Sequence, residues 1–301
     1  MSGNTSTCGV HLNGVHQLLV QMWDEKQRAS EKTKTLHRIY CYLRIIWEST
    51  QLFEEGGAEF DLRSVSHGSV FMMLDHSNLA GPACSTLPGS FSETPGMSSF
   101  EYIYGIPQSL LVMLEDTIKV IHRLDRAKKG IEAFENADAV CNQLEQRILD
   151  WSMAVPQGSG SPAGENAQEE VFRHQSTSFH SALVIYFSQH VRSLDRRYLK
   201  QYVEDVLDSV HKIELIKAET NMLAAPLFWP AFIAATTAYT SEHQARFRKW
   251  YEEANSYGIA TVRTGIFVVL EVWAKGPHSI DSHTCPWRHV VSCKGENLML
   301  S

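Results

Sequence analysis

Apolar residues recur at intervals of three and four along most of the chain, the spacing that places side chains on one face of an α-helix. Such stripes run through residues 36–53, 134–151, 199–213 and 262–273. No alternating apolar–polar run joined by a hairpin dipeptide predicts a strand. We therefore predict an all-α fold, a multi-helix array or bundle with long loops.

Residues that start and stop helices agree with these stripes. Pro107 fits the first turn of a helix that carries several leucines and isoleucines. Ser241 and Gln244 have the spacing of a capping box before another helix, and Gly276 with Pro277 is a stop signal after the last stripe.

Two segments rich in Gly, Pro and Ser interrupt the helical pattern, at about 78–96 and about 155–168. The first predicts a long loop, and the second has the composition of a flexible linker. The linker leaves two readings open, because it can separate two domains or lie on the surface of one. Neither half has turn-rich ends of its own, so we predict one helical domain over residues 1–301.

The most apolar stretch, residues 222–239, is interrupted by Pro226 and Pro230. It is also short for a bilayer span, which needs roughly 20 apolar residues. We predict a buried pair of helices there, in a soluble intracellular protein. The six cysteines are far apart, which favours a reducing compartment over a disulfide framework.

Charge argues against nucleic-acid binding by this chain alone, since phosphate contacts need clustered Lys and Arg. The formal net charge is -7 and the sequence pI is about 6.1. Two small basic groups stand beside acids and predict solvated helix faces: Arg126, Lys128 and Lys129, and Arg246, Arg248 and Lys249.

A helical chain rich in aromatic residues raises the alternative of a terpene-cyclase-like enzyme. Such an enzyme needs carboxylates from two helices around magnesium. Glu204, Asp205 and Asp208 lie in one predicted helix, but no second acidic cluster accompanies them. We predict an exposed acidic helix face and no enzyme.

The sharpest metal-like cluster lies near the end of the chain: His278, His283, Cys285, His289 and Cys293. The last three step by four and suit zinc, but no Cys-x-x-Cys pair anchors them. An amphipathic last helix with Trp287 explains the segment better. The glycines of 158–160 lack the strand and helix of a phosphate-binding loop. We predict no catalytic, cofactor or metal site.

Several segments together resemble the fungal-specific transcription factor domain, found in zinc-cluster regulators of the arginine-metabolism and development type. Residues 100–111 read FEYIYGIPQSLL and resemble that family's F-E-x-x-Y-G-I-P-x-S-L-L signature. Residues 11–15, HLNGV, resemble its H-L-x-G-A helix start, and 227–234, LFWPAFIA, its L-x-W-P-x-F-I-A segment. Residues 269–273 and 287–300 resemble its last two helices. These are packing motifs, so they indicate a fold and not a reaction.

The resemblance implies a C-terminal regulatory domain that acts in transcription in the nucleus, contacts the transcription machinery or related regulators, can form a homodimer, and leaves room for a small-molecule effector. The family's six-cysteine zinc module is not found here, so we expect no DNA contact by this chain. It would be a fragment of a longer factor, a shortened paralogue or the product of a mis-annotated gene start. The alternative is a DNA-independent co-regulator that pairs with full-length relatives.

Overall fold

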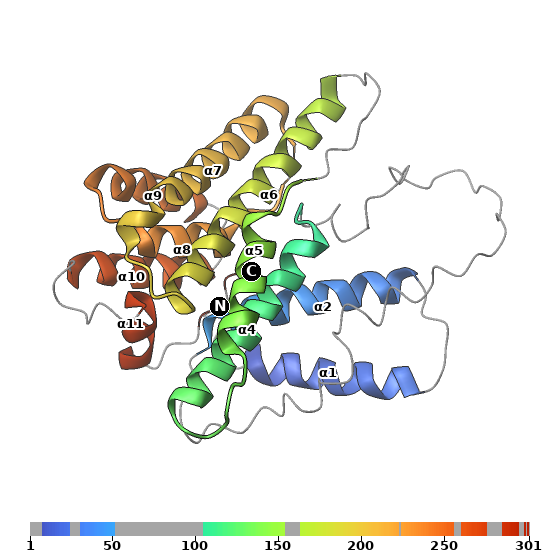
Figure 1. Cartoon of the computed structure of the whole chain (residues 1–301). Coiled ribbons are helices and arrows are strands. Elements are labelled where there is room, and N and C mark those ends of the chain that lie inside the picture. The colour runs from blue at the N-terminus through green and yellow to red at the C-terminus, as the bar shows by residue number, and fades with distance from the viewer. Residues whose placement is uncertain are drawn as a thin grey trace.

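The computed structural model describes residues 8–24, 31–51, 105–153, 163–222, 224–255, 260–275, 285–294, 298 and 300. Every regular element in these ranges is a helix, which confirms the all-α prediction. Figure 1 shows the arrangement. The helices are α1 Cys8–Asp24, α2 Glu31–Thr50, α4 Gln108–Lys128, α5 Ala137–Leu149, α6 Ala163–His190, the 3-10 helix η3 Arg196–Leu199, α7 Lys200–Thr220, α8 Phe228–Thr237, α9 Ser241–Ala254, α10 Ala260–Lys275 and α11 Pro286–Lys294.

Helix α8 is enclosed by its neighbours. All ten of its residues are buried, and it packs against α6, α7, α9 and α10. A helix that is apolar all round can be stable in water only if other elements cover every side. The prediction of a helix pair over 222–239 is corrected: the segment holds one helix, since the described residues before Phe228 are not helical. Pro230 lies in its first turn, where no N–H is required.

Helix α6 is the second central element. It runs side by side with α7 (Figure 1) and also contacts α4, α5 and α8. Every residue from Ser181 to Ser188 is buried, because neighbours cover more than one face. The buried apolar residues of the described chain form one cluster, from Leu12 in α1 to Leu300. No described helix has the length and hydropathy required to cross a membrane.

A small polar network ties the end of α2 into this core. The Tyr186 hydroxyl donates to the carbonyl of Ser49 at 2.8 Å, and Trp229 Nε1 donates to the hydroxyl of Ser49 at 2.8 Å. The Ser49 hydroxyl in turn donates to the carbonyl of Ile46 at 2.6 Å. Ser49 and Trp229 are fully buried. Because each polar atom has a partner, the network fixes α2 on α6 and α8 without leaving an unpaired group.

The corner before α4 requires glycine. Gly105 has a φ of +64°, and a Cβ there would lie 1.6 Å from Oε1 of Gln175 in α6. Both the left-handed backbone and the close approach exclude a side chain. Ile106 is then fully buried, and Pro107 is the residue immediately before the helix. The predicted helix after Pro107 is present, with Pro107 one position ahead of the first turn in which the sequence analysis placed it.

Most of the predicted apolar stripes are buried. Cys141, Leu144 and Ile148 form the inner face of α5. In α2 the prediction is partly wrong, since Leu36 is exposed while Tyr40 lies in the core. The ring of Tyr40 packs beside His16 of α1, with ring centroids 6.4 Å apart. The buried face of α2 is therefore rotated from the predicted one.

Two predicted boundaries also shift. The N-cap of α9 is Thr240, whose Oγ1 accepts from the N–H of His243 at 3.2 Å, and not Ser241. The predicted linker at 155–168 is shorter, because α6 already begins at Ala163. The predicted loop at 78–96 lies outside the described residues.

Candidate protein-interaction surface

Helix α1 is docked on α2 along a narrow face. A Cβ on Gly9 would lie 2.9 Å from the ring of Trp47, so the two helices approach closely there. Leu12 is buried one turn later, and the ring of His16 lies 3.2 Å from a guanidinium nitrogen of Arg44. Burial and the Arg44 charge lower the pKa of His16. The imidazole therefore serves this contact as a neutral ring.

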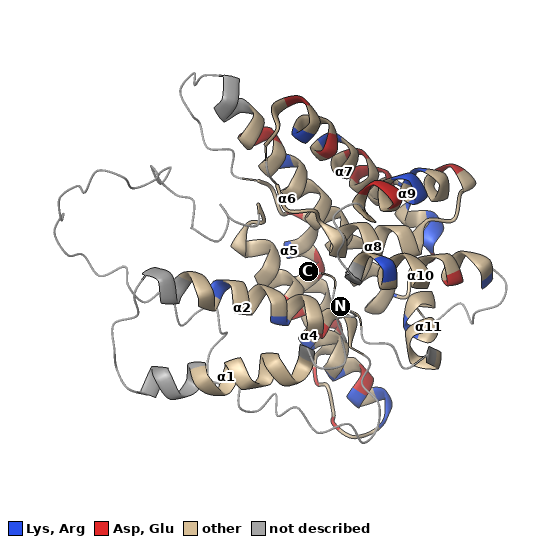
Figure 2. Cartoon of the chain, turned by 180° about the vertical axis from the view of Figure 1, so that it is seen from behind, with Lys and Arg blue, Asp and Glu red and all other residues tan. Residues whose placement is uncertain are grey.

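Over residues 9–18, the face of α1 that points away from α2 is exposed and has no Lys, Arg, Asp or Glu. Val10, Val15 and Leu18 have exposed fractions of 70%, 41% and 60%. A Cβ on Gly14, between them, would meet nothing within 4 Å. The sequence from Cys8 to Trp23 contains no Lys, Arg, Asp or Glu, and Figure 2 shows no charged segment on the described part of α1. Helices that face water normally present charged side chains there.

Helix α2 adds another exposed apolar residue to this region. Gly9 lies opposite Trp47 and His16 lies opposite Tyr40, so the two helices are antiparallel. That register brings Leu36, with an exposed fraction of 66%, toward the C-terminal half of α1. We call Val10, Gly14, Val15, Leu18 and Leu36 the outer α1–α2 face. Exposed apolar residues that gather in one region of a surface mark sites where another macromolecule binds.

A buried ion pair holds the inner side of α2. Arg44 Nε lies 2.7 Å from Glu48 Oε1, and an Arg44 Nη donates to the Tyr40 hydroxyl at 2.9 Å. Burial raises the pKa of Glu48, and the charge of Arg44 opposes that rise. Arg44 and Glu48 thus point toward the molecule.

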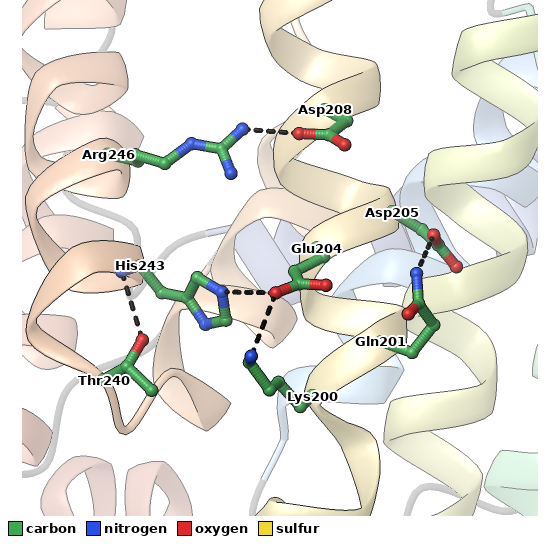
Figure 3. Close-up of polar contacts among 8 residues, drawn as sticks. All are labelled: Lys200, Gln201, Glu204, Asp205, Asp208, Thr240, His243 and Arg246. Carbon is green, nitrogen blue, oxygen red and sulfur yellow. Dashed lines mark hydrogen bonds and ion pairs between the residues drawn. The ribbon is translucent and has the colours of Figure 1, made fainter.

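The acidic residues of α7, which the sequence offered as candidate magnesium ligands, bind neighbouring side chains instead. Glu204 accepts a hydrogen bond from His243 Nε2 of α9 at 3.3 Å and lies 3.4 Å from Lys200 Nζ (Figure 3). The hydrogen bond from His243 is the main cause that lowers the pKa of Glu204. This carboxylate fixes α9 against α7.

The other two carboxylates have separate partners. Asp208 lies 2.5 Å from Arg246 of α9, and Asp205 accepts from Gln201 at 3.1 Å (Figure 3). Glu204, Asp205 and Asp208 therefore point to three different groups and do not converge on one point. In the described ranges no set of three His, Cys, Asp or Glu is placed to hold a metal.

Cys285 of the metal-like cluster lies at the start of α11. The backbone N–H groups of Trp287 and Arg288 point to its sulfur, and the thiol donates to Gln189 Oε1 at 3.8 Å. Burial raises the pKa of the Cys285 thiol to about 12. In the described chain Cys285 thus lies at the start of α11 with backbone N–H groups directed to its sulfur, in the position of a helix cap.

Two further members of that cluster lie on α11. His289 and Cys293 lie one turn apart on α11, with Nε2 and Sγ 3.6 Å apart at an exposed position. His278 and His283 lie outside the described residues, as do the glycines at 158–160. The predicted amphipathic last helix is confirmed, since Trp287, with Val290 and Val291, is buried. The resemblance to a terminal helix over 287–300 extends too far, because α11 ends at Lys294.

The two basic groups are spread over separate helices and engaged with neighbours. Arg126, at the end of α4, lies 3.0 Å from Glu132. In α9, Lys249 lies 3.9 Å from Glu253, and Arg248 lies over the ring of Trp273 at 5.9 Å. Figure 2 shows acidic residues close to these basic ones on α7 and α9. Neither group forms the basic stripe that a phosphate backbone requires.

Sequence reasoning did not single out the outer α1–α2 face as a site. The available signal was the run from Cys8 to Trp23 without any charged residue. Which side of that run is exposed depends on the close approach at Gly9, and that is a tertiary contact.

Comparison with known proteins gives the family. The model of the family described as "Fungal specific transcription factor domain" matches residues 1–301. Arginine metabolism regulation protein II of Saccharomyces cerevisiae (strain ATCC 204508 / S288c) is 22% identical over 364 residues, covering 99% of this chain and 41% of that protein. The chain thus spans less than half of the length of this relative. No solved structure matches.

The helical fold, the corner at Gly105 and the enclosed helix α8 agree with the segments that first suggested this family. The family is one of transcription factor domains and not of enzymes. Its model covers all 301 residues. This chain belongs to the fungal specific transcription factor domain family.

Proposed function

We propose that this chain is a single regulatory domain that acts in the nucleus by binding other proteins through the outer α1–α2 face. The observation that carries the proposal is the uncharged, exposed side of α1, in a chain whose family acts in transcription. Its partners are components of the transcription machinery or related regulators, and α1 supplies the contact residues. The domain makes no DNA contact of its own, which its net charge of -7 supports.

The same face favours pairing between similar chains as a second candidate function. Two copies with a net charge of -7 repel each other, and a region without charged side chains lets them approach with least repulsion. Gly14, which has open space around it, also lets a second helix come close. In this version the chain pairs with a second copy or with a full-length relative and regulates by titrating it.

The test is a fusion of the full chain to an unrelated DNA-binding domain, read by a reporter gene. The double substitution Val15→Lys with Leu18→Glu places two charges on the outer face without touching the core. Leu149→Lys is the matched control, because Leu149 is an exposed apolar residue of α5, with an exposed fraction of 50%. We expect the double variant to abolish the effect on the reporter and the control to keep it.

Sedimentation of the purified chain separates the two versions. Concentration-dependent dimers that the double substitution removes support pairing, while a monomer that still regulates the reporter supports a partner of a different kind. Equal reporter output from the wild-type chain, the double variant and the control would overturn the proposed surface. Circular dichroism of each variant verifies that the helices are retained.

A further inference from the structure

The turn between α6 and α7 exposes two large apolar side chains. Leu194 has an exposed fraction of 43% and Tyr198 one of 75%, the highest among the large apolar side chains of the described chain. The next residue, Leu199, is buried and anchors the turn in the core. The turn thus lies against the molecule while two side chains that pack better on a protein than in water face away from it.

Backbone hydrogen bonds hold this turn in one shape. The N–H of Leu194 donates to the carbonyl of Ser188 in α6 at 3.0 Å, and the N–H of Tyr198 donates to the carbonyl of Asp195 at 3.0 Å. Ser193, which precedes Leu194, has a φ of +52°, in the left-handed region that residues other than glycine rarely adopt. Such a conformation persists only where its surroundings impose it. The two exposed side chains are therefore carried on a fixed backbone, so a partner has little further ordering to impose.

Asp195 holds the guanidinium of Arg197 by one edge. Oδ1 of Asp195 accepts from the backbone N–H of Arg197 at 2.8 Å and from its Nε at 3.0 Å, and Oδ2 accepts from an Nη at 3.3 Å. These hydrogen bonds are the main cause that raises the pKa of Arg197, and the Tyr198 and Tyr239 hydroxyls add to it. The side chain of Arg197 has an exposed fraction of 73%. A guanidinium has five N–H donors, so the edge away from Asp195 can bind a second carboxylate.

The turn is a basic region of an acidic chain. Residues 192–200 contain four basic residues and one acid, while the whole chain has a net charge of -7. The basic residues at the two ends of this segment are already paired, with Glu145 and Glu204. Arg196 forms no ion pair with any residue that the structure describes, and its charge acts on Asp195 at longer range. The turn therefore keeps positive charge beside its two exposed apolar side chains.

We propose that Leu194, Arg196, Arg197 and Tyr198, which we call the turn patch, bind an acidic segment of a partner protein that carries a leucine or phenylalanine among its Asp and Glu residues. One carboxylate of the partner binds the outer edge of Arg197, a second lies near Arg196, and the apolar side chain packs on Leu194 and Tyr198. Exposed Tyr and Arg side chains on a preorganised backbone contribute strongly to protein interfaces. The turn patch uses no residue of the outer α1–α2 face, so this inference goes beyond the proposed function and does not rest on it.

The charges of the turn suit a protein segment better than a nucleic acid. A phosphate backbone requires a row of cations without other partners, because its affinity comes from neutralising many phosphates. In residues 192–200, three of the four basic side chains are held by Glu145, Asp195 and Glu204. A partner with a few carboxylates and an apolar side chain matches the donors and the apolar surface that remain.

The test is the binding of a short fluorescent peptide, a repeat of Glu-Asp-Phe-Glu-Asp-Leu, to the full chain, followed by fluorescence anisotropy. One control peptide has Gln and Asn in place of the acids, and another has Ala in place of Phe and Leu. A short oligothymidine represents nucleic acid. We expect saturable micromolar binding of the acidic peptide that weakens with added salt, and about tenfold weaker binding of both control peptides.

Substitutions in the turn patch locate the site. Tyr198→Ala should weaken binding of the acidic peptide about tenfold, because it removes the exposed ring. Arg197→Glu should abolish that binding. The matched controls are Leu215→Ala, an exposed apolar residue of α7, and Lys249→Glu, an exposed cation of α9 that gives the same change in net charge. Both controls should bind the peptide as the wild type does. Circular dichroism verifies the helices, and if Arg197→Glu does not fold, Tyr198→Ala still decides.

Several outcomes would contradict the turn patch. No saturable binding by the wild-type chain, or equal binding of the acidic and neutral peptides, would overturn it, as would equal losses in Arg197→Glu and Lys249→Glu. Oligothymidine that binds more tightly than the peptide and is lost in the same variants would overturn the choice of a protein partner. The double substitution of Val15 and Leu18 should leave peptide binding unchanged, and a loss there would place the peptide on the outer α1–α2 face instead. A silent reporter with intact peptide binding refutes the proposed function alone.

Discussion

The junction of α7 and α9 and the outer α1–α2 face are both helix surfaces at the edge of the molecule, and they differ in how they carry charge. At the junction, Glu204 and Asp208 pair with His243 and Arg246 of the neighbouring helix (Figure 3). The exposed side of α1 has apolar side chains and no charged residue over residues 9–18 (Figure 2). A helix surface that faces only water carries charges that are solvated or paired. An exposed helix face without charges is instead typical of a site where a partner binds.

The largest effect should come from closing the approach of α1 to α2. Gly9→Leu places a side chain where even a Cβ would lie 2.9 Å from the Trp47 ring, so we expect a loss of about 2 kcal/mol. Hydrogen exchange should show reduced protection confined to α1, with α6 and α8 unchanged. Gly14→Leu is the matched control, since its Cβ meets nothing within 4 Å. Equal protection of α1 in both variants would contradict the docking described above.

At the other region, His243→Ala should lower the free energy of unfolding by about 1.5 kcal/mol, because it removes a buried ring and its hydrogen bond to Glu204. Urea denaturation measures this loss. His243→Phe fills the same space without the hydrogen bond, and it should recover part of the stability. A His243→Ala variant as stable as the wild type would mean that α9 does not depend on this contact.

Lowering the pH should reduce the contribution of Glu204 to the free energy of unfolding. The hydrogen bond from His243 lowers the pKa of this carboxyl below its unfolded value of about 4.3, so its stabilising contribution is present above that value. The contribution is lost as the pH falls through the lower folded pKa. The difference in urea midpoint between the wild type and Glu204→Gln should therefore be constant near neutral pH and shrink in acid. Parallel pH profiles would refute the assignment.

The smallest effect is expected for Arg246→Ala. Its partner Asp208 has an exposed fraction of 69%, and exposed ion pairs contribute about 0.3 kcal/mol. Urea denaturation at low and high salt should show a small difference at low salt that salt removes. A loss above about 1 kcal/mol would mean that this pair, and not His243, holds the two helices together.

The helical class and most inner faces follow from the sequence because they depend on local periodicity, as the stripe of Cys141, Leu144 and Ile148 illustrates. The rotation of α2 did not follow, because the inner position of Tyr40 depends on α1 packing across it. The cap at Thr240 was missed by one residue, since Ser241 offers the same hydroxyl.

The burial of α8 has a consequence for how the chain can fold during synthesis. Trp229 donates to Ser49 across 180 residues of sequence, and the helix that carries it fills the space between α6, α7 and α10. Until residues 228–237 have left the ribosome, α6 and α7 lack the helix that covers their inner faces. Nascent chains that stop short of α8 should therefore depend on chaperones, and the protein should reach its native packing only when its last third has been translated.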